Sequence, residues 1–116
     1  MTPKDAQAHL DQLQSLYRQW LDQKSQLDTL ERHLTAALET ITALERAYMS
    51  DDYHELLALD AKGLLDTTTD GEYSVLSEDT LYNEIIAKEV MLWQLLRLCV
   101  QALDRTRSAD NTDNLV

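Results

Sequence analysis

The chain has 116 residues, a formal net charge of −11 and only two glycines and one proline. This length is typical of one domain with its own hydrophobic core, and the scarcity of helix breakers favours α-helices. The ten Lys and Arg residues are scattered along the chain, which argues against direct nucleic-acid binding because phosphate contacts need clustered basic side chains. The same acidity disfavours binding to anionic membranes.

The sequence gives no sign of export or membrane insertion. It contains no run of about eighteen apolar residues, and no signal-peptide pattern follows Met1. We therefore expect a cytoplasmic protein. The single cysteine, Cys99, lies in the apolar run LLRLCVQAL, where a buried small hydrophobe is commoner than a reactive thiol. We interpret Cys99 as part of the core.

Residues 3–49 predict one long helix. Thr2 has the side chain of an N-cap, and Pro3 suits the first helical position. Apolar residues then recur at intervals of three, four and seven, the spacing of a coiled-coil or bundle seam: Leu10, Leu13, Tyr17, Trp20, Leu27, Leu34, Leu38, Ile41 and Tyr48. Lys24 and Glu31 interrupt this seam. A lone helix of about 70 Å is not stable enough in water, so another surface must cover the seam.

A short helix and a loop follow. Residues 51–61 predict a helix, with Ser50 or Asp51 as its N-cap and Gly63 just beyond its end. Residues 63–76 are rich in β-branched and turn-forming types, and Asp70-Gly71 is a pair typical of tight turns. We predict an ordered loop, with a small hairpin and strand character at residues 73–76 as the alternative.

Residues 78–106 predict the last helix. Ser77 is its predicted N-cap, and Glu78 and Asp79 lie where the helix dipole favours negative charge. Its seam is expected to follow Tyr82, Ile85 or Ile86, Glu89, Leu92 or Trp93, Leu96, Cys99 or Val100, and Leu103. Residues 108–116 are polar and lack periodicity, so we predict a flexible tail.

Together these elements predict an all-α single helical domain over residues 1–107. It is a long antiparallel helical hairpin of coiled-coil type, with a short middle helix and an ordered acidic loop. A second apolar stripe on the last helix, which one partner helix cannot cover, consists of Met91, Leu95, Leu98 and Ala102. The first helix has a corresponding extra line at Leu16, Leu30, Ala37 and Leu44. We therefore expect a homodimer in which two hairpins pair; the alternative is that the short helix folds back over the excess.

Nearly all of the net negative charge lies in residues 50–84, which carry ten acidic side chains against one lysine. Exposed aromatic rings within such a surface are suited to anchor a cationic protein partner. The candidate partner-binding residues are Asp51, Asp52, Tyr53, Glu55, Asp70, Glu72, Tyr73, Glu78 and Asp79. The alternative for Tyr53 and Tyr73 is that both rings pack under the loop and fasten it to the hairpin.

No pattern of catalytic or metal-binding residues is complete. Residues 66–77 match several ligand positions of a calcium-binding EF-hand loop, but Ser77 stands at the twelfth position, where a bidentate Glu is required. None of the three histidines, His9, His33 and His54, has a second His or Cys at ligand spacing. Gly63 and Gly71 match no nucleotide-binding motif. We therefore expect a protein that is not an enzyme and that holds no metal or cofactor.

The stretches AYMSDDYHELLALDAKGLL and YSVLSEDTLYNEI together resemble a small bacterial family of unknown function, DUF4298. The residues that follow the family's order are Tyr48, Ser50, Tyr53, Gly63, Val75, Leu76, Ser77, Glu78, Asp79 and Tyr82. The sequence departs from it at Met49, Tyr53 and Ser74, where the family has Tyr, Trp and Gly, and its central loop lacks the family's Pro and Lys. The resemblance covers about residues 44–103. It implies an all-α intracellular bacterial protein and supplies no activity.

These observations favour a non-enzymatic helical interaction module that presents its acidic segment to a basic protein partner. The alternative is an acidic inhibitor, or an antitoxin-like mimic of nucleic acid, whose carboxylates occupy a nucleic-acid-binding channel. A metal-dependent enzyme is a third class, which requires convergent buried carboxylates.

Overall fold

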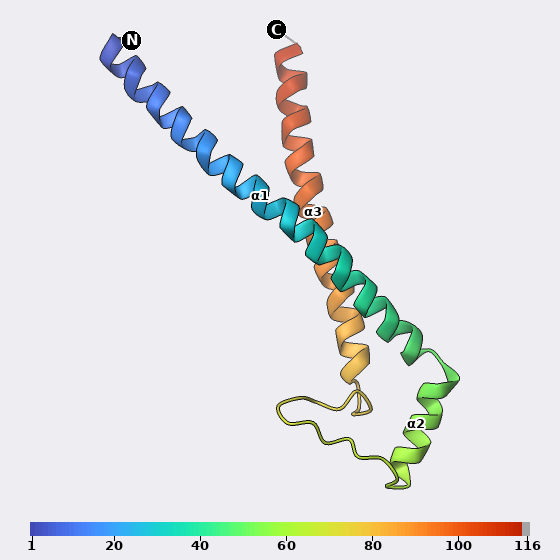
Figure 1. Cartoon of the computed structure of the whole chain (residues 1–116). Helices are drawn as coiled ribbons and strands as arrows, with labels where there is room; N and C mark the ends of the chain where they lie inside the picture. Colours follow the sequence, from blue (N-terminus) through green and yellow to red (C-terminus); the bar gives the residue numbers. More distant parts are fainter. Residues whose placement is uncertain (115–116) are drawn as a thin grey trace. The chain divides into compact units, whose positions relative to one another are not determined.

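A computed structural model describes the backbone of residues 1–114 and the side chains of residues 1–106. Three helices make up most of the chain: α1 (Pro3–Tyr48), α2 (Asp51–Ala61) and α3 (Thr80–Asn114) (Figure 1). The described backbone contains no strand, so the all-α prediction is confirmed. The chain divides into two compact units, Met1–Thr40 and Ile41–Val116. Folding as a single cooperative domain stays a prediction.

Helix α1 begins where the sequence predicts. The Thr2 hydroxyl accepts a hydrogen bond from the Asp5 N–H (3.1 Å), and the Thr2 carbonyl accepts one from the Ala6 N–H (2.9 Å). The helix continues for 46 residues because no glycine, and no proline after Pro3, interrupts it. Its part up to Thr40 is the whole of the first unit, and every side chain of residues 1–33 is exposed.

Helix α2 is bounded by well-formed caps, as predicted. The Ser50 hydroxyl accepts a hydrogen bond from the Tyr53 N–H (3.3 Å) and donates one to the Ala47 carbonyl (2.6 Å). At the other end Gly63 has a φ of +72°, its N–H bonds the Asp60 carbonyl (2.9 Å), and the next N–H, of Leu64, bonds the Leu59 carbonyl (3.1 Å). This is the Schellman pattern, in which glycine is favoured at the left-handed position.

The loop between α2 and α3 is a series of tight turns. The Glu72 N–H bonds the Thr69 carbonyl (3.2 Å) across Asp70-Gly71, and Gly71 has a φ of +76°. The Asp66 carboxylate accepts a hydrogen bond from the Thr68 N–H (2.9 Å). The turn at Asp70-Gly71 is therefore confirmed. The hairpin alternative is wrong, because residues 73–76 pair with no strand.

Helix α3 begins later and ends later than predicted. Its first residue is Thr80, whose N–H bonds the Ser77 carbonyl (3.2 Å), and the next turn starts with the Asn83 N–H on the Asp79 carbonyl (2.8 Å). Asp79, with a φ of +63°, thus occupies the N-cap position, and the prediction that Ser77 caps this helix is wrong. The helix runs to Asn114 because no glycine or proline stops it, well beyond its predicted end at residue 106. The flexibility of residues 108–114 stays a prediction. Residues 115–116 lie outside the described residues.

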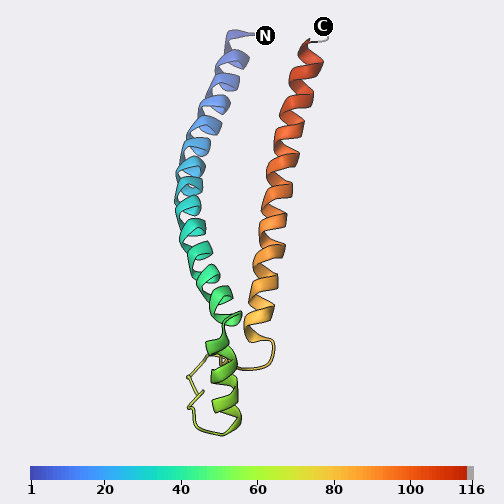
Figure 2. The ribbon, with the colours of Figure 1, turned by 90° about the vertical axis from the view of Figure 1, so that its right-hand side faces the viewer.

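In the second unit, the last turns of α1 lie antiparallel to the first turns of α3 (Figure 2). Lys88 on α3 forms an ion pair with Glu45 on α1, and both side chains are half-buried. The covered line on α3 is Leu81, Ile85, Lys88, Leu92 and Leu95. The predicted seam is therefore wrong by one residue at Tyr82, Glu89 and Leu96, which are exposed, and right at the alternatives Ile85 and Leu92.

The hydrophobic core is very small. Leu81, 5% exposed, is the one buried side chain in the part of the chain whose side chains are described. Cys99 is exposed, so its predicted place in the core is wrong. Three of the six leucines of α3, Leu96, Leu98 and Leu103, are exposed. Over the residues described, no helix has the length and apolar character needed to cross a membrane.

Candidate functional site

The candidate site is the acidic corner, which we define as residues 50–84: α2, the loop and the first turn of α3. Of its ten acidic side chains, nine are exposed and Asp60 is half-buried. The ion pair between Lys88 and Glu45 is the only one among the described side chains, and neither residue belongs to the corner. The carboxylates of the corner therefore face water without a cationic partner from the described chain.

Two of these carboxylates complement the dipole of a helix. Asp51 and Asp52 lie in the first turn of α2, where the free N–H groups and the helix dipole stabilise negative charge. Glu55, one turn further along, is exposed. The dipole explains the two aspartates at the start of α2, but it does not explain the acidic residues of the loop.

The two tyrosines of the corner are in different environments. Tyr53 is half-buried, its hydroxyl donates a hydrogen bond to the Val75 carbonyl (3.0 Å), and its ring centroid lies 5.3 Å from that of Tyr48. Tyr53 thus fastens the loop to α2, which is the packing alternative considered from the sequence. Tyr73 is 89% exposed. Of the two candidate aromatic anchors, the structure leaves Tyr73 free on the surface.

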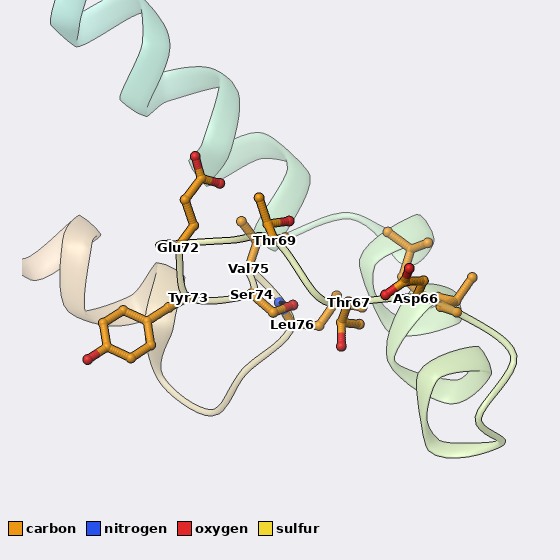
Figure 3. Close-up of a pocket in the computed structure, with 10 residues that line it drawn as sticks. Asp66, Thr67, Thr69, Glu72, Tyr73, Ser74, Val75 and Leu76 are labelled. Carbon is orange, nitrogen blue, oxygen red and sulfur yellow. Dashed lines mark hydrogen bonds between the residues drawn. The ribbon is translucent and has the colours of Figure 1, made fainter.

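Tyr73 lies between two open hollows of the corner. The first, of about 330 Å³, is shown in Figure 3 and is lined by Leu56, Leu65, Asp66, Thr67, Thr69, Glu72, Tyr73, Ser74, Val75 and Leu76. The second, of about 320 Å³, is lined by Tyr73, Ser77, Glu78, Thr80, Asn83 and Glu84. Each hollow combines carboxylates with the aromatic ring, a combination that suits Lys and Arg side chains.

The structure does not gather all of the predicted residues at these hollows. Glu72 and Tyr73 line the first hollow, and Tyr73 and Glu78 line the second. The α2 acids Asp51, Asp52 and Glu55, and the turn residues Asp70 and Asp79, line neither. Asp66 and Glu84 do line them, although neither is among the partner-binding residues predicted from the sequence.

The corner offers no metal centre in the described part of the chain. No group of three or more His, Cys, Asp or Glu side chains is placed there to hold an ion. The Asp66 carboxylate, first position of the EF-hand-like pattern, instead bonds the backbone N–H of Thr68 within its own turn. The pattern in the sequence therefore reflects turn formation.

The predicted dimer stripe on α3 is largely accessible. Met91 is 42% exposed, Leu98 is 61% exposed, and Ala102 is exposed, whereas Leu95 is half-buried on the line of Leu81 and Leu92. Trp93, assigned to the seam as an alternative to Leu92, is 61% exposed. Because α3 is apolar on nearly all sides, its spacing did not distinguish the covered face from the free one.

Comparison with known proteins finds one match. The model of a family described as "Domain of unknown function (DUF4298)" matches residues 10–98. The match covers most of α1, all of α2 and the loop, and the first half of α3. It therefore begins well before residue 44, where the resemblance noted in the sequence begins. No curated protein and no solved structure matches the chain.

Proposed function

The chain belongs to the DUF4298 family, whose description names no activity, and we propose from its own surface that it is a non-enzymatic helical interaction module. The acidic corner is the surface that it presents, and the partner is a protein with a basic surface. One observation carries the proposal: the corner has nine exposed carboxylates without an ion pair among the described side chains, and four of them line the two hollows beside the exposed Tyr73.

The corner suits this role because its backbone is held in place before binding. The Schellman cap at Gly63, the turn at Gly71 and the hydrogen bond from Tyr53 to Val75 each fix a different part of the loop. A loop that is already ordered loses less conformational entropy when a partner binds. A net charge of one sign on this loop also steers a basic partner toward it.

The test compares two variants of equal charge change. In the corner variant, Asp70→Asn, Glu72→Gln and Glu78→Gln remove three charges near Tyr73. In the control, Asp22→Asn, Asp28→Asn and Glu39→Gln remove three exposed charges from α1. Each immobilised protein is incubated with lysate of the source cells at low and at high salt. High salt shortens the screening length from about 10 Å at 0.1 M to about 3 Å at 1 M.

We expect the wild type and the control to retain the same protein at low salt and to lose it at high salt, and the corner variant to retain much less of it. Equal retention by all three proteins would contradict the proposal. If duplex DNA displaces the retained protein, that protein is a nucleic-acid binder, and the alternative function of an acidic inhibitor or nucleic-acid mimic takes precedence.

We also propose that the module acts as a homodimer with coiled-coil character, in the cytoplasm of a bacterium. The support for the dimer is the small core. Among the side chains that the structure describes, Leu81 is the one that is buried, and many leucines are left for a partner to cover. The bacterial cytoplasm is supported by the acidic composition, the single free cysteine and the nature of the family resemblance.

A further inference from the structure

The first unit, Met1–Thr40, is a single helical segment whose apolar seam is exposed from Leu10 to Leu27, whereas Leu34 and Leu38 are half-buried. The five exposed seam side chains are each about half exposed: Leu10 55%, Leu13 49%, Tyr17 55%, Trp20 50% and Leu27 52%. They follow the alternating three- and four-residue steps that place side chains along one line of a helix. An exposed row of this size, with two aromatic rings, is typical of a surface that binds another protein.

The chain's own second long helix is too short to cover all of this seam. Helix α1 has 46 residues and α3 has 35, which correspond to about 69 Å and about 53 Å at 1.5 Å per residue. Antiparallel pairing of the two helices over the whole length of α3 would still leave about three turns of α1 without a partner. Those turns include Leu10.

The charges within the seam identify the occupant. Lys24 and Glu31 occupy seam positions seven residues apart, with apolar residues before and after them. In a parallel pair of identical helices, each charge would face its own copy and be repelled. In an antiparallel pair whose two-fold axis lies between them, Lys24 of each chain comes within about one helical turn of Glu31 of the other. The seam is therefore self-complementary in one orientation only.

We propose that residues 13–38 of α1 form an antiparallel coiled coil with the same residues of a second copy. This inference rests on the proposed homodimer and assigns its interface to α1 instead of to the α3 stripe. The two-fold axis crosses between Lys24 and Glu31, which places the acidic corners of the two chains at opposite ends of the dimer interface. A dimer built in this way presents two separate acidic surfaces.

Charge reversal tests the orientation. Lys24→Glu alone and Glu31→Lys alone each turn two attractive pairs into repulsive ones, and each should raise the dimer dissociation constant at least about tenfold. The combined variant should restore it to within about threefold of the wild-type value. Arg18→Glu and Glu39→Lys, one position beside seam residues Tyr17 and Leu38, are the matched controls and should have little effect. If the reversals at Lys24 and Glu31 raise the dissociation constant no more than these controls do, the proposed interface is wrong.

Cross-linking gives an independent result. In a Cys99→Ser background, Leu27→Cys lies near the proposed two-fold axis and should be joined to a second copy by a short bis-maleimide. Leu13→Cys lies far from its own copy and should not be joined. Joining at both positions would show a parallel pair, and joining at neither would show that α3 or another surface forms the dimer. A monomer by light scattering at micromolar concentration would overturn the dimer altogether and leave the acidic corner's capture of a partner unaffected.

Discussion

The acidic corner and the first unit differ in what holds them in shape. The corner is short and irregular, yet its turns are fixed by specific hydrogen bonds, among them Ser50 to Tyr53, Gly63 to Asp60 and Tyr53 to Val75. The first unit is one regular helix whose seam is exposed over its first 33 residues. The conformation of the acidic corner is determined by its own residues, whereas the first unit requires another surface to cover its seam.

This difference has a general physical basis. A helix of any length forms its hydrogen bonds internally, but it is only marginally stable in water unless an apolar face is buried. A loop with caps and turns needs little buried area because each bond fixes the backbone locally. The effect on stability of substitutions on the seam of the first unit should therefore depend on protein concentration. The effect of substitutions in the corner should not.

The largest effect is expected on the seam. Trp20→Glu together with Leu27→Glu should raise the dimer dissociation constant by more than about 100-fold, because each side chain contributes about 1.5–3 kcal/mol when buried. The helix content should fall with it. Light scattering and far-UV circular dichroism measure the two changes. Gln12→Glu with Gln19→Glu adds the same charge beside the seam and should leave both readings close to those of the wild type.

The next largest effect is expected at the core of the second unit. Leu81 is the one buried side chain among those described in this unit. Leu81→Ala should lower the free energy of unfolding by about 2–4 kcal/mol in urea titrations. Leu64→Ala, at a site 67% exposed, should change it by less than about 0.5 kcal/mol. Equal effects of the two substitutions would show that Leu81 is not at the core.

Glycine replacements should give a smaller loss. Gly63 and Gly71 have φ values of +72° and +76°, and an added Cβ would meet no atom within 4 Å at either position. Alanine should therefore destabilise through the backbone alone, by about 1–2 kcal/mol at each site. Asparagine, which tolerates this conformation better, should cost less than alanine. If urea titrations find alanine neutral at both sites, the two left-handed turns are not formed in solution.

The smallest effect concerns the two tyrosines. Tyr53→Phe removes the hydrogen bond to the Val75 carbonyl and should cost about 0.5–1.5 kcal/mol, with faster hydrogen exchange in the loop. Tyr73→Phe, at a position 89% exposed, should leave both quantities unchanged. A larger effect at Tyr73 than at Tyr53 would reverse the assignment of anchor and free ring.

Local chemistry made much of the fold predictable from the sequence. Thr2-Pro3, Ser50 and Gly63 mark helix ends because their preferences depend on the nearest few residues, and the observed bounds of α1 and α2 agree with them to within one residue. The turn at Asp70-Gly71 was predictable for the same reason. The start of α3 was not: Ser77 has a suitable side chain, but the turn at residues 77–80 moves the first helical residue to Thr80.

Features that depend on distant contacts could not be predicted in the same way. Helix α3 begins with two pairs of adjacent apolar residues, Leu81-Tyr82 and Ile85-Ile86, so the three-four spacing fits both Leu81 and Tyr82 as the first seam residue. The core position of Leu81 depends on where α1 lies. Tyr53 and Tyr73 have similar neighbours in sequence, and only the path of the loop, which brings the Val75 carbonyl to Tyr53, separates them. The fold of the corner also determines that Asp66 and Glu84 line the hollows, which their positions in the sequence do not indicate.

The central claim is that a second copy covers the seam of the first unit, and the molar mass in solution tests it most directly. Multi-angle light scattering over a dilution series should give twice the chain mass of 13.3 kDa at micromolar concentration. Lys24→Glu should shift the mass toward that of one chain, and the combined exchange with Glu31→Lys should shift it back. A mass of one chain for the wild type throughout the series would contradict the claim.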